Sequence, residues 1–198
     1  MSAEQALAFV IFATVAAITP GPSNVMLMAS GAAGGVLRGL PCLFGVGAGM
    51  ALMMFVVAFG LGAIVLAHPA LVVVLKGFGA AFLLWLSWRI ARAPQAADAS
   101  AGARPVGFLG AFAFQWLNPK SWLVSTSAAA AYLPGGASAL LQASWIAGLF
   151  VVVVLACGLV WLAFGAAMRR LLTSPKSHRA FNATMGVLLA CSVLLLLW

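Results

Sequence analysis

The stretch Thr19-Pro20-Gly21-Pro22-Ser23-Asn24 lies inside a long apolar run that covers residues 5–31. A second apolar run, residues 107–133, is interrupted in the same way by Asn118-Pro119-Lys120-Ser121. Proline inside a helix removes a backbone hydrogen bond and clashes with the preceding turn. In the hydrocarbon of a bilayer, such a break is tolerated only where protein or water satisfies the freed backbone groups. The two stretches therefore predict two broken helices that face a common cavity.

The composition excludes an ordinary soluble domain. Of 198 residues, 65% are hydrophobic and 6% are charged, whereas soluble domains have about 25% charged residues. A helix needs about 20 mostly apolar residues to cross a bilayer. Runs of about that length cover residues 5–31, 40–66, 70–92, 107–133, 138–168 and 180–198. The sequence therefore predicts an all-α integral membrane protein with six transmembrane helices, of which the first and fourth are broken at proline.

The basic residues predict the orientation of these helices. Eight of the ten Lys and Arg residues lie in the first, third and fifth connections; they are Arg38, Arg89, Arg92, Arg104, Arg169, Arg170, Lys176 and Arg179. The second and fourth connections, around His68-Pro69 and Pro134-Gly135-Gly136, have none. Because positive loops stay in the cytoplasm, we expect the odd-numbered connections there and both termini in the periplasm.

The chain also divides into two halves. Residues 94–106 form a linker within a single transmembrane domain, residues 1–198, and separate a first repeat (1–93) from a second (107–198). Each half opens with a proline-broken helix, which is typical of transporters built from internal repeats around a central site. Because each half has three crossings, we expect the two repeats to be inverted relative to each other.

The broken helices predict an anion site. Asn118 is a favourable N-cap and Pro119 a favourable first helical residue, while Thr19 or Gly21 would cap a second half-helix. Helix N-termini carry partial positive charge, and Lys120 adds a full one, so the site suits a carboxylate. A lysine at the centre of a transmembrane helix costs about 2.5–3.5 kcal/mol, which makes it a functional candidate by default. Alternatively, Lys120 caps a carbonyl or reaches the interface, and the prolines are packing kinks.

Other residues predict packing rather than chemistry. Glycines at four-residue spacing, Gly31-Gly35-Gly39 and Gly45-Gly49, and the small residues after Lys76 indicate close helix contacts, and a homodimer through such a face is one possibility. Lys76 would extend to the interface or contact substrate. The two histidines and two acidic residues are too scattered for an active site or metal cluster, so we expect no catalytic residue, no metal and no cofactor. The net charge of +8 belongs to membrane loops, and no nucleic-acid partner is expected.

Four stretches resemble, in order, the LysE/RhtB family of amino-acid exporters. They are Thr19 to Asn24, the glycine-rich stretch through Arg38-Gly39 and Gly45-Val46-Gly47, Lys76 to Arg89, and Gly107-Phe108-Leu109 through Lys120. The resemblance implies proton-driven export of amino acids or close derivatives across the bacterial inner membrane. The substrate-binding candidates are Thr19, Pro20, Gly21, Pro22, Ser23, Asn24, Asn118, Pro119, Lys120 and Ser121. Phe82 replaces a common tyrosine, and Ser125 to Ala128 replace common aromatics, at positions that could shape the cavity.

The charges narrow the substrate. A site for lysine or arginine would need a carboxylate inside the membrane, and the only acidic residues are Glu4 near one surface and Asp98 in the linker. We therefore expect a neutral amino-acid substrate and the lipid bilayer as the partners of the chain. Two alternatives are a non-transporting membrane subunit that packs through its glycine faces and, less favoured, a cation transporter. Hard cations prefer oxygen-rich sites with carboxylates, which this chain lacks.

Overall fold

The computed structural model describes residues 2–61, 67–92, 105–133, 139–171 and 174–197. Most of the predicted linker, including Asp98 and Arg104, lies outside these ranges, as does Pro134-Gly135-Gly136. The side chains of Lys76, Arg169 and Arg170 also lie outside the description.

Every regular element in the described ranges is helical, which confirms the all-α prediction. The elements are α1 (Ala3–Ile18), α2 (Pro22–Val56), the π-helix η1 (Val57–Leu61), α4 (Pro69–Ala91), α5 (Phe108–Leu117), α6 (Pro119–Tyr132), α7 (Ala139–Leu171) and α8 (Pro175–Leu197). The two predicted breaks therefore separate α1 from α2 and α5 from α6. Pro22 and Pro119 each stand at the start of the second helix, where the missing N–H group would have no partner in any case.

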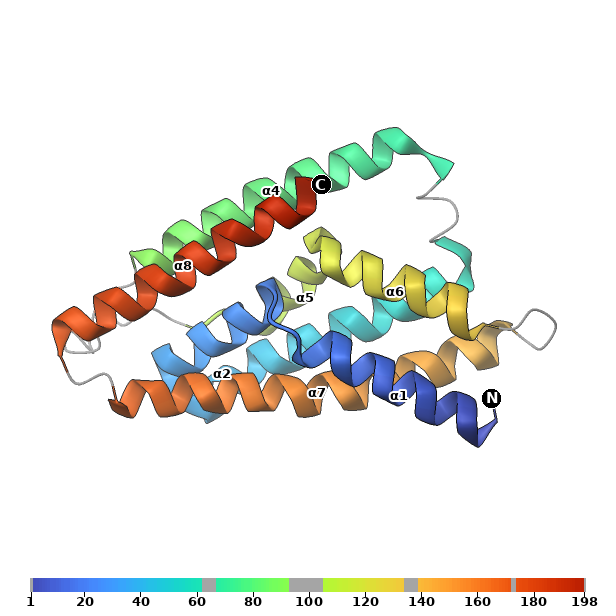
Figure 1. Cartoon of the computed structure of the whole chain (residues 1–198), viewed down its shortest axis with the longest axis horizontal. Coiled ribbons are helices and arrows are strands. Elements are labelled where there is room, and N and C mark those ends of the chain that lie inside the picture. The colour runs from blue at the N-terminus through green and yellow to red at the C-terminus, as the bar shows by residue number, and fades with distance from the viewer. Residues whose placement is uncertain (1, 62–66, 93–104, 134–138, 172–173, 198) are drawn as a thin grey trace.

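The helix α2 is sharply bent at Gly35. This residue has φ 77° and ψ 178°, a conformation that glycine adopts far more readily than other residues. Figure 1 shows that the part of α2 after the bend turns back along the bundle. The predicted first connection is thus reduced to Gly35, and Arg38 lies inside a helix. Gly35, predicted as a packing residue, makes this turn through its backbone conformation.

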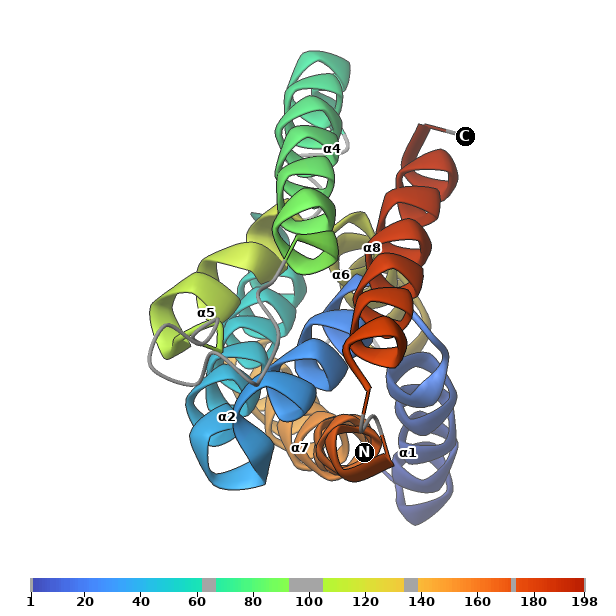
Figure 2. The ribbon, with the colours of Figure 1, turned by 90° about the vertical axis from the view of Figure 1, so that its left-hand side faces the viewer.

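The helices form two groups. The first contains α2, which packs most extensively on α7 and next on α5, together with α1 and α6. The second is the pair α4 and α8, which pack on each other along one side of the bundle (Figures 1 and 2). The α2 bend, the end of α4 and the start of α8 lie at one end of the bundle, whereas the N-terminus and the end of α6 lie at the other (Figure 1).

Glycines allow α2 to approach its neighbours closely. A Cβ atom on Gly31 would collide with the carbonyl oxygen of Leu162 in α7, and one on Gly165 in α7 would collide with that of Met28. Gly45 and Gly49 face the backbone of α5 in the same way, and Gly39 faces the Leu162 side chain. The packing prediction is confirmed for Gly31, Gly39, Gly45 and Gly49. Within the described part of the chain, nothing lies within 4 Å of the Cβ position of Gly77, so that glycine makes no close helix contact there.

Two described helices are long and apolar enough to cross a membrane by length and composition, Pro22–Gly60 and Leu140–Met168. The helices before the two breaks, α1 and α5, are apolar but too short to meet this criterion alone. The count of six crossings and the inverted repeats therefore stay predictions.

The last helix begins earlier than the apolar pattern indicated. It starts at Pro175 rather than at residue 180, and Ser174 caps it by accepting a hydrogen bond from Ser177 N at 3.1 Å. The first turn of α8 is polar, so a search for apolar runs passes over it.

The contact between α2 and α7 predicts a difference between two glycine substitutions in α7. Gly165→Ala places a methyl group against the backbone of α2, and overpacking of this kind typically costs about 1–3 kcal/mol. Gly148→Ala meets open space and replaces a poor helix former with a good one. We expect a lower midpoint of thermal unfolding in detergent for Gly165→Ala and an unchanged or slightly higher one for Gly148→Ala. Equal midpoints would show that the close approach does not contribute to stability.

Candidate functional site

The two helix breaks meet at Gln115, near the end of α5. This side chain is fully buried. Its Oε1 atom accepts hydrogen bonds from Ser23 Oγ at 3.0 Å and from Ser121 Oγ at 3.1 Å, and its Nε2 atom donates to the carbonyl oxygen of Ala111 at 3.2 Å. Ser23 lies in the first turn of α2 and Ser121 in the first turn of α6. Gln115 therefore joins the two half-helices that follow the breaks.

Asn118 extends this network and caps α6. Its Oδ1 atom accepts a hydrogen bond from Lys120 N at 3.1 Å, and its Nδ2 atom donates to Ser23 Oγ at 3.0 Å. The predicted N-cap is therefore confirmed, with Pro119 at the first helical position. The same bond occupies the backbone amide of Lys120, which is therefore not free to bind an anion.

At the first break, Gly21 is the N-cap of α2, and Thr19 instead ends α1. The first backbone bond of α2 runs from Val25 N to Gly21 O at 3.0 Å. The amides of Ser23 and Asn24 precede this bond and have no carbonyl partner within the helix. The first turn of α2 thus has two amides without a partner in its own helix, whereas in α6 the Lys120 and Ser121 amides are bonded to Asn118.

Lys120 crosses from the second break to the first. Its Nζ atom donates a hydrogen bond to the carbonyl oxygen of Thr19 at 2.6 Å. That carbonyl lies at the C-terminal end of α1, where the helix carries partial negative charge. The structure therefore shows the carbonyl-capping alternative for Lys120. A Cβ atom on Gly21 would lie 2.9 Å from Lys120 Cδ, so a larger residue there would require the lysine side chain to shift.

The Asn24 side chain hydrogen-bonds to the backbone carbonyls at the first break. Its Nδ2 atom donates to the carbonyl oxygens of Ala17 at 3.0 Å and Thr19 at 2.8 Å. The two carbonyls are thereby satisfied without a continuous helix. The C-terminal end of α1 and the N-terminal end of α2 consequently face the same small space.

A cavity of about 50 Å³ lies at this point. Six of the predicted residues line it, namely Gly21, Ser23, Asn24, Asn118, Lys120 and Ser121. Thr19 contributes the carbonyl that holds Lys120, whereas Pro20, Pro22 and Pro119 shape the breaks without lining the cavity. The rest of the lining is mostly apolar and includes Leu27, Val46, Met50, Val124, Phe150 and Val154. The cavity thus has one polar and one apolar side.

Sequence reasoning missed Gln115 and the apolar wall. Gln115 carried a usable signal, because it is an uncharged polar residue within an apolar run, three positions before Asn118. Polar residues inside membrane helices are uncommon and mark functional sites. The apolar wall carried no such signal, since its members resemble every other residue of the bundle.

The two departures from the family pattern do not line this cavity. Phe82 packs in α4 with its ring centre 5.3 Å from that of Phe114. Ser125 is fully buried one turn after Ser121, and within the described part of the chain its hydroxyl has no hydrogen-bond partner.

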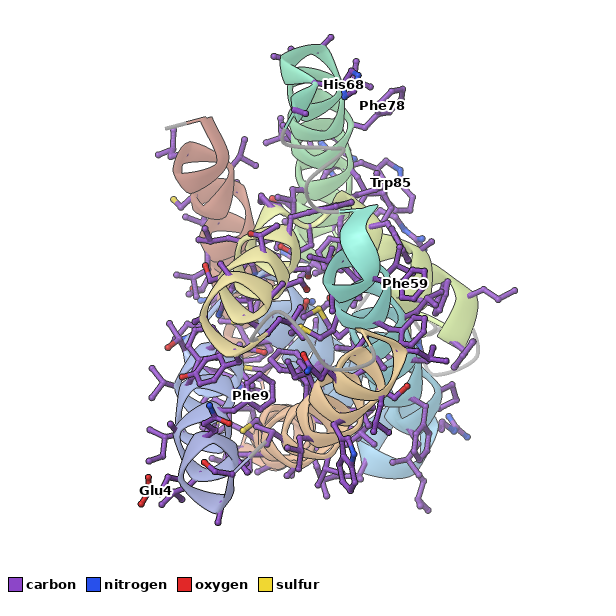
Figure 3. All side chains as sticks on the ribbon, turned by 90° about the vertical axis from the view of Figure 1, so that its right-hand side faces the viewer. Glu4, Phe9, Phe59, His68, Phe78 and Trp85 are labelled. Carbon is purple, nitrogen blue, oxygen red and sulfur yellow. The ribbon has the colours of Figure 1, made fainter. Side chains whose placement is uncertain are left out.

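Acidic and metal-binding groups are absent from the described site. Glu4 lies on the outer part of α1, pointing away from the bundle (Figure 3). The residues that the structure describes contain no cluster of three His, Cys, Asp or Glu side chains. The described lining therefore has the positive charge of Lys120 but no carboxylate that could pair with a cationic side chain.

Two comparisons with known proteins agree on the same family. A profile described as LysE type translocator matches residues 14–197. The cysteine/O-acetylserine efflux protein of Salmonella typhimurium (strain LT2) is 33% identical over 151 residues, covering 75% of this chain and 74% of the relative. The protein of the same name from Escherichia coli (strain K12) is 29% identical over 190 residues, covering 94% of each. No solved structure matches the chain.

The Gln115 network predicts a loss of stability on truncation. Gln115→Ala leaves the buried hydroxyl of Ser121 and the half-buried hydroxyl of Ser23 without their shared acceptor, and a buried unsatisfied group costs about 1–3 kcal/mol. Gln142→Ala in α7 is the matched control, because that side chain is only half-buried. We expect a clearly lower unfolding midpoint for Gln115→Ala than for Gln142→Ala in the same detergent. A Gln115→Ala protein as stable as the control would mean that the network does not hold the breaks together.

Proposed function

Because the chain belongs to the LysE type translocator family, we propose that it exports a small neutral amino acid, or a close derivative, from the cytoplasm. As a member of this family it is an integral protein of the inner membrane and a transporter rather than an enzyme. The relatives named as cysteine/O-acetylserine efflux proteins support a small neutral substrate.

One observation carries the proposal: Lys120 Nζ lies at the wall of the cavity, beside the N-terminal turn of α2. An arriving carboxylate would compete with the Thr19 carbonyl for Lys120 Nζ. It would also accept hydrogen bonds from the free amides of Ser23 and Asn24. An ammonium–carboxylate bond adds the attraction between two full charges that the ammonium–carbonyl bond lacks, and this attraction favours the exchange.

The same exchange frees an acceptor for the substrate's ammonium group. Once Lys120 turns to the carboxylate, the Thr19 carbonyl at the negative end of α1 becomes available. A cation is favoured at this helix end, just as an anion is favoured at the start of α2. The first break would thus bind both charges of a zwitterionic amino acid, with each charge at the helix end of opposite sign.

The apolar wall would receive the side chain. Leu27, Met50 and Phe150 offer no charge or hydrogen bond to it, and a cavity of about 50 Å³ leaves room only for a small group. Lysine or arginine would bring an unpaired charge into an apolar space, at a cost of several kcal/mol. These features support a neutral substrate.

The orientation of the chain follows from its charges. We propose that the end of the bundle with the α2 bend, the end of α4 and the start of α8 faces the cytoplasm, because those segments carry most of the Lys and Arg residues. Both termini would then be periplasmic.

Efflux of radiolabelled amino acids from proteoliposomes tests the proposal. We expect small neutral amino acids, such as cysteine and serine, to leave the vesicles, and lysine and arginine to be retained. Lys120→Met preserves the length of the side chain but removes its charge, so it should lower the efflux rate by about tenfold or more, the loss expected for one charge-assisted bond. Lys176→Met, at an exposed position of α8, is the matched control and should leave the rate unchanged.

Two results would count against the proposal in different ways. If no amino acid moves under any imposed gradient, the export function is wrong. If neutral amino acids move but Lys120→Met transports like Lys176→Met, export stands and the anion site is wrong.

A further inference from the structure

A second and larger cavity, of about 370 Å³, lies between α2, α4 and the start of α5. Met26 and Ser30 line it from α2, Phe82 and Arg89 from α4, and Pro105 and Gly107 from the segment that leads into α5. Pro105 also lies against α2 beside the bend, because a Cβ atom on Gly34 would be 2.8 Å from Pro105 Cγ. The cavity is therefore near the basic end of the bundle.

Arg89 supplies the only charge in the described lining of this cavity. It lies in the last turn of α4, and its guanidinium carbon is 5.1 Å from the centre of the Trp85 ring. Figure 3 shows Trp85 on one flank of α4, pointing away from the helix axis. The described lining contains no carboxylate, and the Arg89 side chain is exposed.

Arg92, the C-cap of α4, differs from Arg89 in its position relative to the cavity. The guanidinium carbon of Arg92 lies 3.5 Å from the centre of the Trp88 ring, and Arg92 does not line the cavity. Arg89 and Arg92 thus both lie at the C-terminal end of α4, and each places its charge over a tryptophan ring. They differ in that only Arg89 lines the cavity.

The two cavities are lined by neighbouring residues of the same helices. Consecutive residues of α2 line the two, with Met26 on the larger cavity and Leu27 on the smaller. Phe82 lines the larger cavity and contacts the ring of Phe114, which precedes Gln115 of the smaller one. Along α2, Asn24 and Ser30 are only roughly 9 Å apart at 1.5 Å per residue. Met26 is unbranched and flexible, which suits a residue that must move aside.

We propose that the larger cavity is the loading site of the exporter, where the carboxylate of a cytoplasmic amino acid binds Arg89 before it passes to Lys120. This inference rests on the proposed export function. The planar guanidinium of arginine holds a carboxylate through two parallel hydrogen bonds. A cavity with positive charge and apolar walls also raises the local concentration of an anionic group. Arg89 and Lys120 would then be successive binding sites for the same carboxylate.

The test offers the substrate at the cytoplasmic face of inside-out vesicles and measures the initial transport rate against the concentration of cysteine. Arg89→Gln should raise the half-saturating concentration by about tenfold and leave the maximal rate nearly unchanged, because the variant affects loading and spares the Lys120 site. Arg89→Lys, which keeps the charge but not the paired hydrogen bonds, should fall between the parent and Arg89→Gln. Arg92→Gln should behave like the parent.

Each alternative has its own result. Parent-like kinetics for Arg89→Gln would overturn the loading site and leave export intact, whereas a parent protein that transports nothing would overturn both. A lower maximal rate with the half-saturating concentration unchanged would show that Arg89 has no part in loading.

An anionic lipid headgroup could also bind Arg89, so the assay is repeated in phosphatidylcholine vesicles with and without phosphatidylglycerol. An Arg89 effect confined to the anionic lipid would assign the cavity to lipid and overturn the proposal.

Discussion

Backbone groups freed by a helix break inside a membrane must find other hydrogen-bond partners, and this requirement explains the centre of the molecule. Asn24 satisfies the carbonyls at the end of α1, and Asn118 satisfies the first amide of α6. Gln115 and Ser23 then join the two breaks to each other. The surrounding bundle keeps this polar group in place, since the glycines of α2 bring α5 and α7 close enough to enclose it.

The same requirement leads to function. A broken helix exposes a negative end and a positive end across a few residues, and a zwitterionic amino acid carries the complementary charges. Lys120 occupies the negative end of α1 through the Thr19 carbonyl. A ligand that takes Lys120 away from Thr19 therefore changes a contact between α1 and α6, which lie on opposite sides of the two breaks. Under the proposed exchange, substrate binding would be coupled to the relative position of the two broken helices.

The sequence predicted the breaks, the N-cap at Asn118, the glycine contacts of α2 and the family, because each depends on local rules or on a distinctive motif. It could not show that Lys120 reaches Thr19, since that contact joins residues about a hundred positions apart. It also could not show the sharp bend at Gly35, because a glycine in a helical run is compatible with both packing and turning. Gln115 stands between these cases: its polarity was visible in the apolar run, but its partners come from three different helices.

The central claim is that Lys120 exchanges the Thr19 carbonyl for the carboxylate of the substrate. Solid-state NMR on the reconstituted protein can measure the distances from an isotopically labelled Lys120 side-chain nitrogen to the carbonyl carbon of Thr19 and to the carboxylate carbon of bound cysteine. We predict that added cysteine lengthens the first distance and brings the second to roughly 3–4 Å, as a direct charge-assisted hydrogen bond requires. A Lys120 nitrogen that stays on Thr19 while cysteine is bound would contradict the account.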